Sequence, residues 1–173
     1  MNNVRELLLS GETFEFRLMA LIRATFPNAA ILHDLRLYSR FLDKETQIDV
    51  VVIDSSGVFV IEAKNWKFWI KGEYNDQRWS GLTSDRKVIT VFNPYHQNFI
   101  HVRELRNAIR VHTGVNPIGF KNLVVLPDGT EIHSTCKEVV NLSSLPDAMK
   151  KLSVPNSVNV QMYKELIGKS VRG

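Results

Sequence analysis

The sequence predicts a mixed α/β fold of the α+β kind, with one mixed sheet that carries helices on both faces. Its 173 residues are 44% hydrophobic and 23% charged, which is the composition of one globular domain. The periodic segments follow the order helix, three strands, helix, strand. Two of these strands are apolar on both faces, as central strands of a covered sheet are. We therefore expect residues 1–173 to form a single domain with a sizeable core.

The first half of the chain supplies one helix and three strands of this prediction. Residues 11–26 are predicted to be helical, because Phe14, Leu18 and Ile22 recur at helical spacing and Pro27 then ends the pattern. Segments with alternating or β-branched residues follow and are predicted to be strands. These strands are 30–38, 47–53 and 58–64, and the turn DSSG at 54–57 joins the last two.

The clearest helix is predicted at residues 93–114. Asn93 can cap its start, Pro94 suits its first position and Gly114 suits its end. Its apolar stripe consists of Phe99, Val102, Leu105 and Ile109. Weaker patterns predict strand pieces before Gly81, strands at 86–92 and 138–142, a strand with a Pro-Asp-Gly turn over 120–129, and short helices near 145–152 and 157–168.

Composition excludes several classes of protein. The single cysteine, Cys136, rules out an intrachain disulfide and a multi-cysteine metal site, so a reducing cytoplasm is the expected location. No apolar run approaches the roughly 18 residues of a membrane span, and the N-terminus has no signal-peptide pattern. We therefore expect no membrane partner. The formal net charge of +4 favours an anionic partner only weakly.

The predicted hairpin around DSSG brings polar side chains from two strands to one strand end. With a loop of two or four residues, Asp49 faces Glu62 and Gln47 faces Lys64 on the same face of the sheet. A loop of three or five residues would slip the register and send these side chains to opposite faces. The function prediction depends on the register in which Asp49 faces Glu62. The same alternation places Ile48, Val50 and Val52 on one face, and Val51 and Ile53 on the other.

Two opposed carboxylates, Asp49 and Glu62, repel each other when they lose water, and a bound cation would remove that cost. Oxygen ligands of this kind suit Mg²⁺ or Mn²⁺, which keep several waters and bind phosphate oxygens. The Ala63 carbonyl is a candidate third ligand, and Lys64 is a candidate for orienting the attacking water and offsetting phosphate charge. The alternative is an exposed ion pair at a strand end, with Asp49 solvated.

An acid followed by a strand and then E-x-K resembles the signature of the PD-(D/E)xK nuclease superfamily. Longer blocks are similar to one branch of it, the nuclease-related domain (NERD) family. These blocks are GETFE (11–15), TQIDVVVIDSSGVFVIEAKNW (46–66), Gly72 with Trp79, and NPYHQN (93–98). The resemblance covers roughly residues 10–112, and Ile48 stands where the superfamily's name has proline.

This resemblance implies a restriction-endonuclease-like core of helix, three antiparallel strands, helix and strand. It also implies metal-dependent cleavage of phosphodiester bonds in nucleic acid, with DNA favoured. The matching metal-binding acids are Asp49 and Glu62, with Glu15 contributed by the first helix. The motif lysine is Lys64, and Gln47 matches the amide two positions before the aspartate.

Residues around these motifs are candidates for binding the substrate. Gln97, in the first turn of the second helix, is placed to contact a phosphate or a catalytic carboxylate, and His101 lies one turn later on the same helix face. Capping and solvation are the alternative roles for both. The candidate phosphate-binding cations are Lys67, Lys71, Arg103 and Arg106, and Trp66 and Trp69 are interleaved with the lysines.

Three functions stay open on these grounds. The first is a Mg²⁺-dependent or Mn²⁺-dependent nuclease, which the complete acid, acid and lysine set favours. The second is a catalytically silent module that binds nucleic acid or a protein partner on the same fold. The third is a domain whose partner protein supplies targeting. A two-fold homodimer would suit cleavage of both strands of a duplex.

Overall fold

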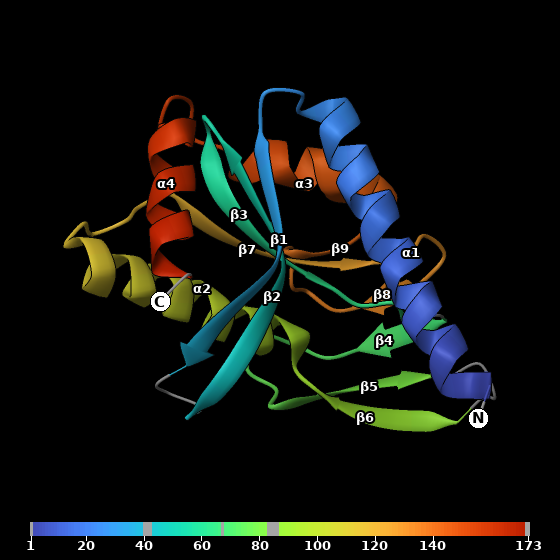
Figure 1. Cartoon of the computed structure of the whole chain (residues 1–173). Helices are drawn as coiled ribbons and strands as arrows, with labels where there is room; N and C mark the ends of the chain where they lie inside the picture. The colour runs from blue at the N-terminus through green and yellow to red at the C-terminus, as the bar shows by residue number, and fades with distance from the viewer. Residues whose placement is uncertain (1, 40–42, 67, 83–86, 172–173) are drawn as a thin grey trace.

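A computed structural model describes the backbone of residues 2–39, 43–66, 68–82 and 87–171, and the side chains from Phe14 onward within these ranges. Over this part of the chain the protein is a mixed α/β structure with four α-helices and two mixed sheets (Figure 1). No helix in these ranges is long and apolar enough to cross a membrane. In chain order the elements are α1 (Asn2–Thr25), β1 (Ala30–Ser39), β2 (Lys44–Asp54), β3 (Gly57–Ala63), β4 (Trp69–Lys71), β5 (Arg78–Leu82), β6 (Val88–Phe92), α2 (Pro94–Thr113), β7 (Phe120–Leu126), β8 (Glu131–His133), β9 (Val139–Asn141), a 3-10 turn (Leu142–Ser144), α3 (Leu145–Leu152) and α4 (Val160–Ser170).

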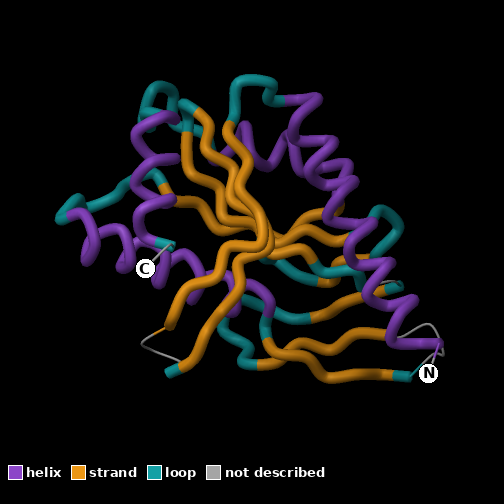
Figure 2. Tube along the Cα trace, viewed as in Figure 1, coloured by secondary structure: helices purple, strands orange, loops and turns teal. Residues whose placement is uncertain are grey.

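The larger sheet has the strand order β1-β2-β3-β7-β9 and carries helices on both faces (Figures 1 and 2). β2 runs antiparallel to both of its neighbours, β1 and β3, and β7 and β9 run parallel to β3. On one face α1 and α3 pack against Val50 and Val52. On the other face α2 and α4 pack against Val51 and Ile53. The prediction of a mixed sheet covered on both faces is confirmed.

A second sheet, of order β6-β5-β4-β8, was not predicted, so the expectation of a single sheet is wrong. Its buried residues Ile70 and Trp79 pack against Val124 and Leu126 of β7. A β-carbon at residue 72 would clash with the Trp79 ring, so only glycine fits there. That close approach explains why Gly72 and Trp79 occur together in the sequence pattern.

The helix boundaries differ from prediction at one helix and agree at another. α1 begins at Asn2 rather than at residue 11. At the start of α2, the Asn93 side-chain oxygen Oδ1 accepts hydrogen bonds from the backbone amides of Tyr95 (2.9 Å) and His96 (3.2 Å). At its end, Gly114 has a φ of 73° and donates to the Arg110 carbonyl at 2.9 Å. The predicted caps of α2 are therefore confirmed.

The buried face of α2 departs from the predicted apolar stripe at its first turns. Phe99 is 51% exposed, whereas Asn98 and His101 are buried. Val102, Leu105 and Ile109 are buried as predicted. Two polar side chains thus take the place of the aromatic ring where α2 crosses the sheet.

β2 and β3 pair in the predicted register, from Val50 opposite Ile61 to Asp54 opposite Gly57. The loop contains two residues, and the Asp54 carboxylate accepts hydrogen bonds from the Ser56 amide (3.0 Å) and hydroxyl (2.6 Å). The continuation of this register brings the ends of the two strands, which carry the predicted acids, to the same place.

The side-chain alternation of β2 reverses at Asp49. Ile48 packs in the same cluster as Val51, although regular alternation would place it with Val50. β1 is irregular at the same level, because Asp34 has a φ of 50° and the β1–β2 ladder omits Asp34 and Asp49. The expectation that Ile48 shares a face with Val50 is therefore wrong.

Candidate active site

Glu62, at the end of β3, is the centre of a buried polar cluster. Its side chain is 2% exposed. The Oε1 atom accepts a hydrogen bond from Gln97 Nε2 at 2.6 Å and lies 2.5 Å from Lys64 Nζ. The Oε2 atom lies 3.2 Å from His101 Nδ1. One carboxylate is thus held by a lysine that follows its own strand and by two side chains of α2.

His101 joins Glu62 to β2. Its Nε2 atom lies 2.9 Å from the Thr46 hydroxyl. Among the described residues, neither Glu62 Oε2 nor His101 Nδ1 has a hydrogen bond of good geometry, although the two atoms are within ion-pair distance. The reversal at Asp49 places Thr46, rather than Gln47, on the α2 side of the strand. Thr46 was therefore missed by the sequence analysis, which assumed regular alternation.

The pKa of Glu62 reflects two opposed effects. Burial acts to raise it, because burial disfavours the charged form. The contacts from His101 and Lys64 outweigh burial and hold the pKa below its usual value. The Glu62 carboxyl is therefore an anion at neutral pH.

Asp49 lies beside this cluster at the point where the β2–β3 ladder ends. Its Oδ2 atom accepts a hydrogen bond from the Ala63 backbone amide at 2.8 Å. Burial, followed by the negative charge of Glu62, raises the pKa of Asp49 to about 7. The Ala63 amide and Lys64 counter this rise only in part. Asp49 therefore titrates near neutrality, unlike its neighbour.

Glu15 approaches Asp49 from α1. The Glu15 side chain is half-buried, and its charge contributes to the raised pKa of Asp49. Phe14 and Leu18, on the same helix, are buried against the sheet and fix the position of this turn. Because α1 and α2 cover opposite faces, side chains from both can meet only near the ends of the strands. Glu15 and Glu62 thus lie close enough to Asp49 for both of their charges to raise its pKa.

Asn98 fixes the first turns of α2 on the sheet. Its Nδ2 atom lies 2.8 Å from the Val60 carbonyl of β3 and 2.9 Å from the Leu123 carbonyl of β7. It also lies 2.7 Å from the Asn122 side-chain oxygen. These contacts hold α2 across the β3–β7 pair, so that Gln97 faces the carboxylate at the strand end.

Lys64 directly follows β3. Its backbone amide donates to the Val125 carbonyl at 2.9 Å, which extends the pairing with β7 by one residue. Its Nζ atom lies 5.7 Å from the centre of the Trp66 ring, and the side chain is 20% exposed. The ammonium group therefore has Glu62 on one side and an aromatic face near it, and the side chain as a whole is partly open to solvent.

The donor set at this strand end fits a divalent cation that keeps several waters. A cation between Asp49 and Glu62 would remove the cost that raises the pKa of Asp49. Over the described parts of the chain, no three His, Cys, Asp or Glu side chains are grouped to hold an ion. The chain therefore offers two carboxylates rather than a closed cage. The Ala63 carbonyl, water and phosphate oxygens would complete such a site, as is usual for Mg²⁺.

Three predicted residues lie apart from the cluster or outside the structure. Gln47 is exposed on β2 opposite Arg36, and within the described ranges it makes no hydrogen bond to Glu62 or Lys64. Lys71 is exposed on β4 of the second sheet. Lys67 lies outside the described residues.

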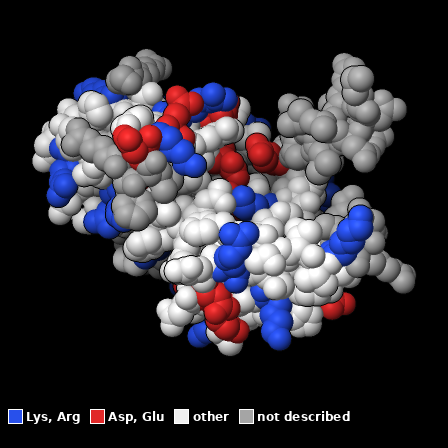
Figure 3. Space-filling view, turned by 90° about the horizontal axis from the view of Figure 1, so that it is seen from below, with Lys and Arg blue, Asp and Glu red and all other residues white. Residues whose placement is uncertain are grey.

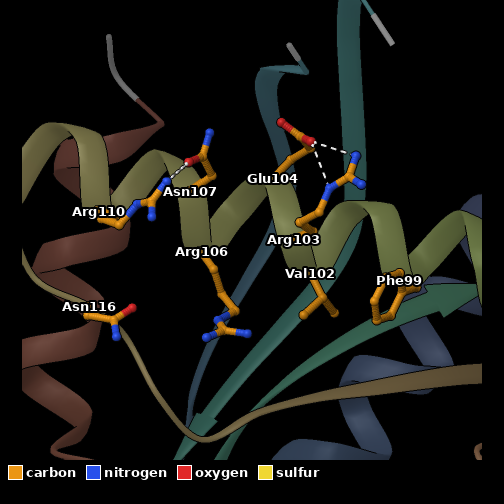
Figure 4. Close-up of a pocket in the computed structure, with 8 residues that line it drawn as sticks. All are labelled: Phe99, Val102, Arg103, Glu104, Arg106, Asn107, Arg110 and Asn116. Atoms are coloured by element: carbon orange, nitrogen blue, oxygen red, sulfur yellow. Dashed lines mark hydrogen bonds and ion pairs between the residues drawn. The ribbon is translucent and has the colours of Figure 1, made fainter. Parts of the chain in front are cut away.

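The two predicted arginines lie on α2 but not on the flank that faces Glu62. Arg106 follows Gln97 by about two and a half helical turns, which places the two residues on opposite sides of the helix. Arg103 and Arg106 line a groove there (Figure 4). In Figure 3, which views the molecule from below, acidic and basic side chains lie side by side near the middle of the face.

Comparison with known proteins agrees with the sequence blocks. The family model described as nuclease-related domain matches residues 10–127, which is more than half of the chain. An uncharacterized protein of Bacillus anthracis is 41% identical over 76 residues, which cover 43% of this chain and 34% of that relative. The match thus spans about a third of the relative's length. No solved structure matches the chain. The chain belongs to the nuclease-related domain (NERD) family.

Proposed function

We propose that this protein is a metal-dependent nuclease that hydrolyses phosphodiester bonds in nucleic acid, with DNA as the favoured substrate. The observation that carries the proposal is the meeting of Asp49, Glu62 and Lys64 at one strand end, with Gln97 of α2 against Glu62. Membership of the nuclease-related domain family supports it. We further propose that α1, β1 to β3, α2 and β7 form a restriction-endonuclease-like core.

In this proposal different residues bind the metal ion and contact the attacking water or the phosphate. Asp49 and Glu62 would hold a Mg²⁺ or Mn²⁺ ion with the Ala63 carbonyl as a further oxygen donor, and Glu15 would hold a second ion or an ion-bound water. Such an ion, when bound, polarises a phosphoryl oxygen and lowers the pKa of bound water. Lys64 would donate from Nζ to the attacking water or to a phosphate oxygen, because its side chain is partly open to solvent.

Gln97 and His101 would act through Glu62. Their contacts at 2.6 Å and 3.2 Å fix the orientation of its two oxygens. A ligand held in one orientation binds its ion better, so both are positioning residues. Gln47 is exposed, and its proposed role is contact with the substrate rather than with Glu62.

A second candidate function is a catalytically silent module that binds nucleic acid or a protein partner. Two observations favour it. Glu62 is already compensated by Lys64 and approached by His101, and Asp49 has a raised pKa that permits it to be neutral. Such a site can persist without an ion, as a closed internal network.

A substrate panel distinguishes the two functions. Purified protein is incubated with linear, circular and single-stranded DNA and with RNA, in Mg²⁺, in Mn²⁺ and in chelator, beside Lys64→Ala. The nuclease proposal expects ion-dependent cleavage that Lys64→Ala loses, while circular dichroism shows that the variant is still folded at the assay temperature. Binding of nucleic acid without cleavage, and with the same affinity in ion and chelator, would favour the silent module.

Assembly and location are also proposals. A two-fold homodimer, or a partner protein that supplies targeting, would extend the recognition of substrate beyond this chain. We propose a cytoplasmic protein with no membrane partner. Light scattering of the purified chain with and without duplex DNA tests the dimer, and co-purification from cells tests the partner protein.

A further inference from the structure

A groove with a volume of about 520 Å³ runs along the flank of α2 that faces away from Glu62 (Figure 4). It spans α2 from its second turn to its last, a length of about 16 Å along the helix axis. The residues that give it its chemistry are Phe99, Val102, Arg103, Arg106, Arg110 and Asn116.

Phe99 supplies the apolar part of the groove, and about half of the residue is exposed. Phe99 is 51% exposed, although its position in the helical pattern predicted a buried residue. Figure 4 shows Phe99, Val102 and Arg106 on the same side of α2, extending toward the segment that carries Asn116. An aromatic ring, a valine and a guanidinium group therefore line one continuous surface.

Among the residues that the structure describes, Arg106 is the groove cation without a hydrogen-bonding or ionic partner. Arg103 is paired with Glu104 at 3.1 Å, and Arg110 contacts the Asn107 side chain at 3.0 Å. Arg106 makes no hydrogen bond or ion pair with the part of the chain that the structure describes. The Glu104 charge is offset by Arg103, so the groove presents net positive charge to an incoming anion.

We propose that this groove binds single-stranded nucleic acid, with Arg106 on a phosphate and Phe99 stacked on a base. A phosphate alone would use Arg106 but not the exposed ring. In a duplex the base faces are already stacked on each other, so Phe99 can reach a base only in a single strand. An acidic peptide would match the arginines but leaves the ring without a specific partner. The inference rests on the proposed nuclease function, since the strand held in the groove would belong to that enzyme's substrate.

Fluorescence anisotropy with a labelled single-stranded oligonucleotide, in chelator, tests the groove separately from cleavage. Wild type is compared with Phe99→Leu, Phe99→Tyr, Arg106→Ala and Arg106→Lys. Arg23→Ala, on the exposed surface of α1, is the matched control for loss of one positive charge. Single-stranded DNA, single-stranded RNA and duplex DNA are titrated at several salt concentrations, and circular dichroism confirms that each variant is folded.

Loss of stacking should weaken single-strand binding by at least about five-fold in Phe99→Leu, and Phe99→Tyr should retain it because it keeps an aromatic face. The slope of the logarithm of the binding constant against the logarithm of salt concentration should fall in Arg106→Ala by the amount expected for about one phosphate contact. Arg106→Lys and Arg23→Ala should leave this slope unchanged. Equal binding by Phe99→Leu and Phe99→Tyr, or tighter binding of duplex than of single strand, would overturn the proposal. The chelator prevents ion-dependent cleavage, so these titrations measure binding alone. A protein that binds single strands as expected but cleaves nothing in Mg²⁺ or Mn²⁺ would contradict only the nuclease proposal.

Discussion

His101 joins two strands beyond the end of their ladder, since its Nε2 atom lies 2.9 Å from Thr46 of β2 and its Nδ1 atom lies 3.2 Å from Glu62 of β3. The ladder itself ends at Val50 and Ile61, one residue before Glu62 and four residues after Thr46. The ring is buried, so water cannot replace either contact readily. The orientation of the Glu62 carboxylate therefore depends on a helix residue as well as on its own strand.

Replacement of His101 by alanine should lower the free energy of unfolding by about 1–3 kcal/mol, because a buried carboxylate loses a partner. His101→Asn should recover part of this loss, since its amide can stand in place of Nδ1. Urea denaturation at pH 7 measures both. Thr46→Val is the control, because it removes only the outer contact. Equal losses in Thr46→Val and His101→Ala would show that the contact with Glu62 contributes little.

Asp49 should make the protein less stable as pH rises from about 4 to about 7. Its pKa is raised in the folded protein from an ordinary 3.8 to about 7, so the folded chain holds a proton that the unfolded chain has released. The loss should be on the order of a few kcal/mol and complete above pH 7. Glu62, with a lowered pKa, adds stability that is lost only as pH falls below its ordinary value of 4.5.

Asp49→Asn isolates this effect because it keeps an acceptor for the Ala63 amide and removes the titration. Urea denaturation at pH 5 and pH 8, in chelator, should show a smaller fall in stability for Asp49→Asn than for wild type. The variant should therefore be relatively more stable at pH 8. The same pH dependence in both proteins would mean that Asp49 is not held at a raised pKa.

Binding of Mn²⁺ should release a proton at pH 6 but not at pH 8. At pH 6 the Asp49 carboxyl is mostly protonated in the folded protein, and a bound cation favours its ionised form. Titration calorimetry in two buffers of different ionisation enthalpy counts the released protons. Asp49→Asn should abolish the release, and Glu62→Gln should weaken binding. Binding without proton release at pH 6 would place the ion away from Asp49.

Asn98 should matter for stability far more than its neighbours on the surface of α2. Asn98→Ala leaves two buried carbonyls, of Val60 and Leu123, without this donor and should cost about 2–3 kcal/mol. Asn107→Ala, on the same helix but toward solvent, should change stability by less than about 0.5 kcal/mol. Thermal and urea unfolding of the two variants make the comparison. A small loss in Asn98→Ala would show that α2 is held on the sheet by its apolar residues alone.

The register of the β2–β3 hairpin and the caps of α2 were predictable because local chemistry determines them. Asp54 and Ser56 form a two-residue loop, and Asn93 and Gly114 fit the ends of α2. The meeting of the two acids at one strand end followed from that register and needed no knowledge of distant contacts.

Features set by distant contacts were not predictable. The reversal at Asp49 accompanies an irregular Asp34 on a neighbouring strand, and no pattern within β2 announces it. The second sheet depends on the parallel pairing of β4 with β8, two strands of three residues each. His101 had one available signal, since it follows Gln97 by one helical turn. Its burial could be recognised only when α2 was placed on the sheet.

The rate of Mn²⁺-dependent DNA cleavage by Asp49→Asn, measured beside wild type and Glu45→Gln, shows whether Asp49 serves an ion-dependent nuclease site. Both substitutions remove one carboxylate from β2 without changing side-chain size, but Glu45 is exposed and away from the Glu62 cluster. We expect ion-dependent cleavage by wild type, a loss of at least about 100-fold in Asp49→Asn and little change in Glu45→Gln. Cleavage by Asp49→Asn at the wild-type rate, or no cleavage by the wild type in any ion, would contradict this expectation.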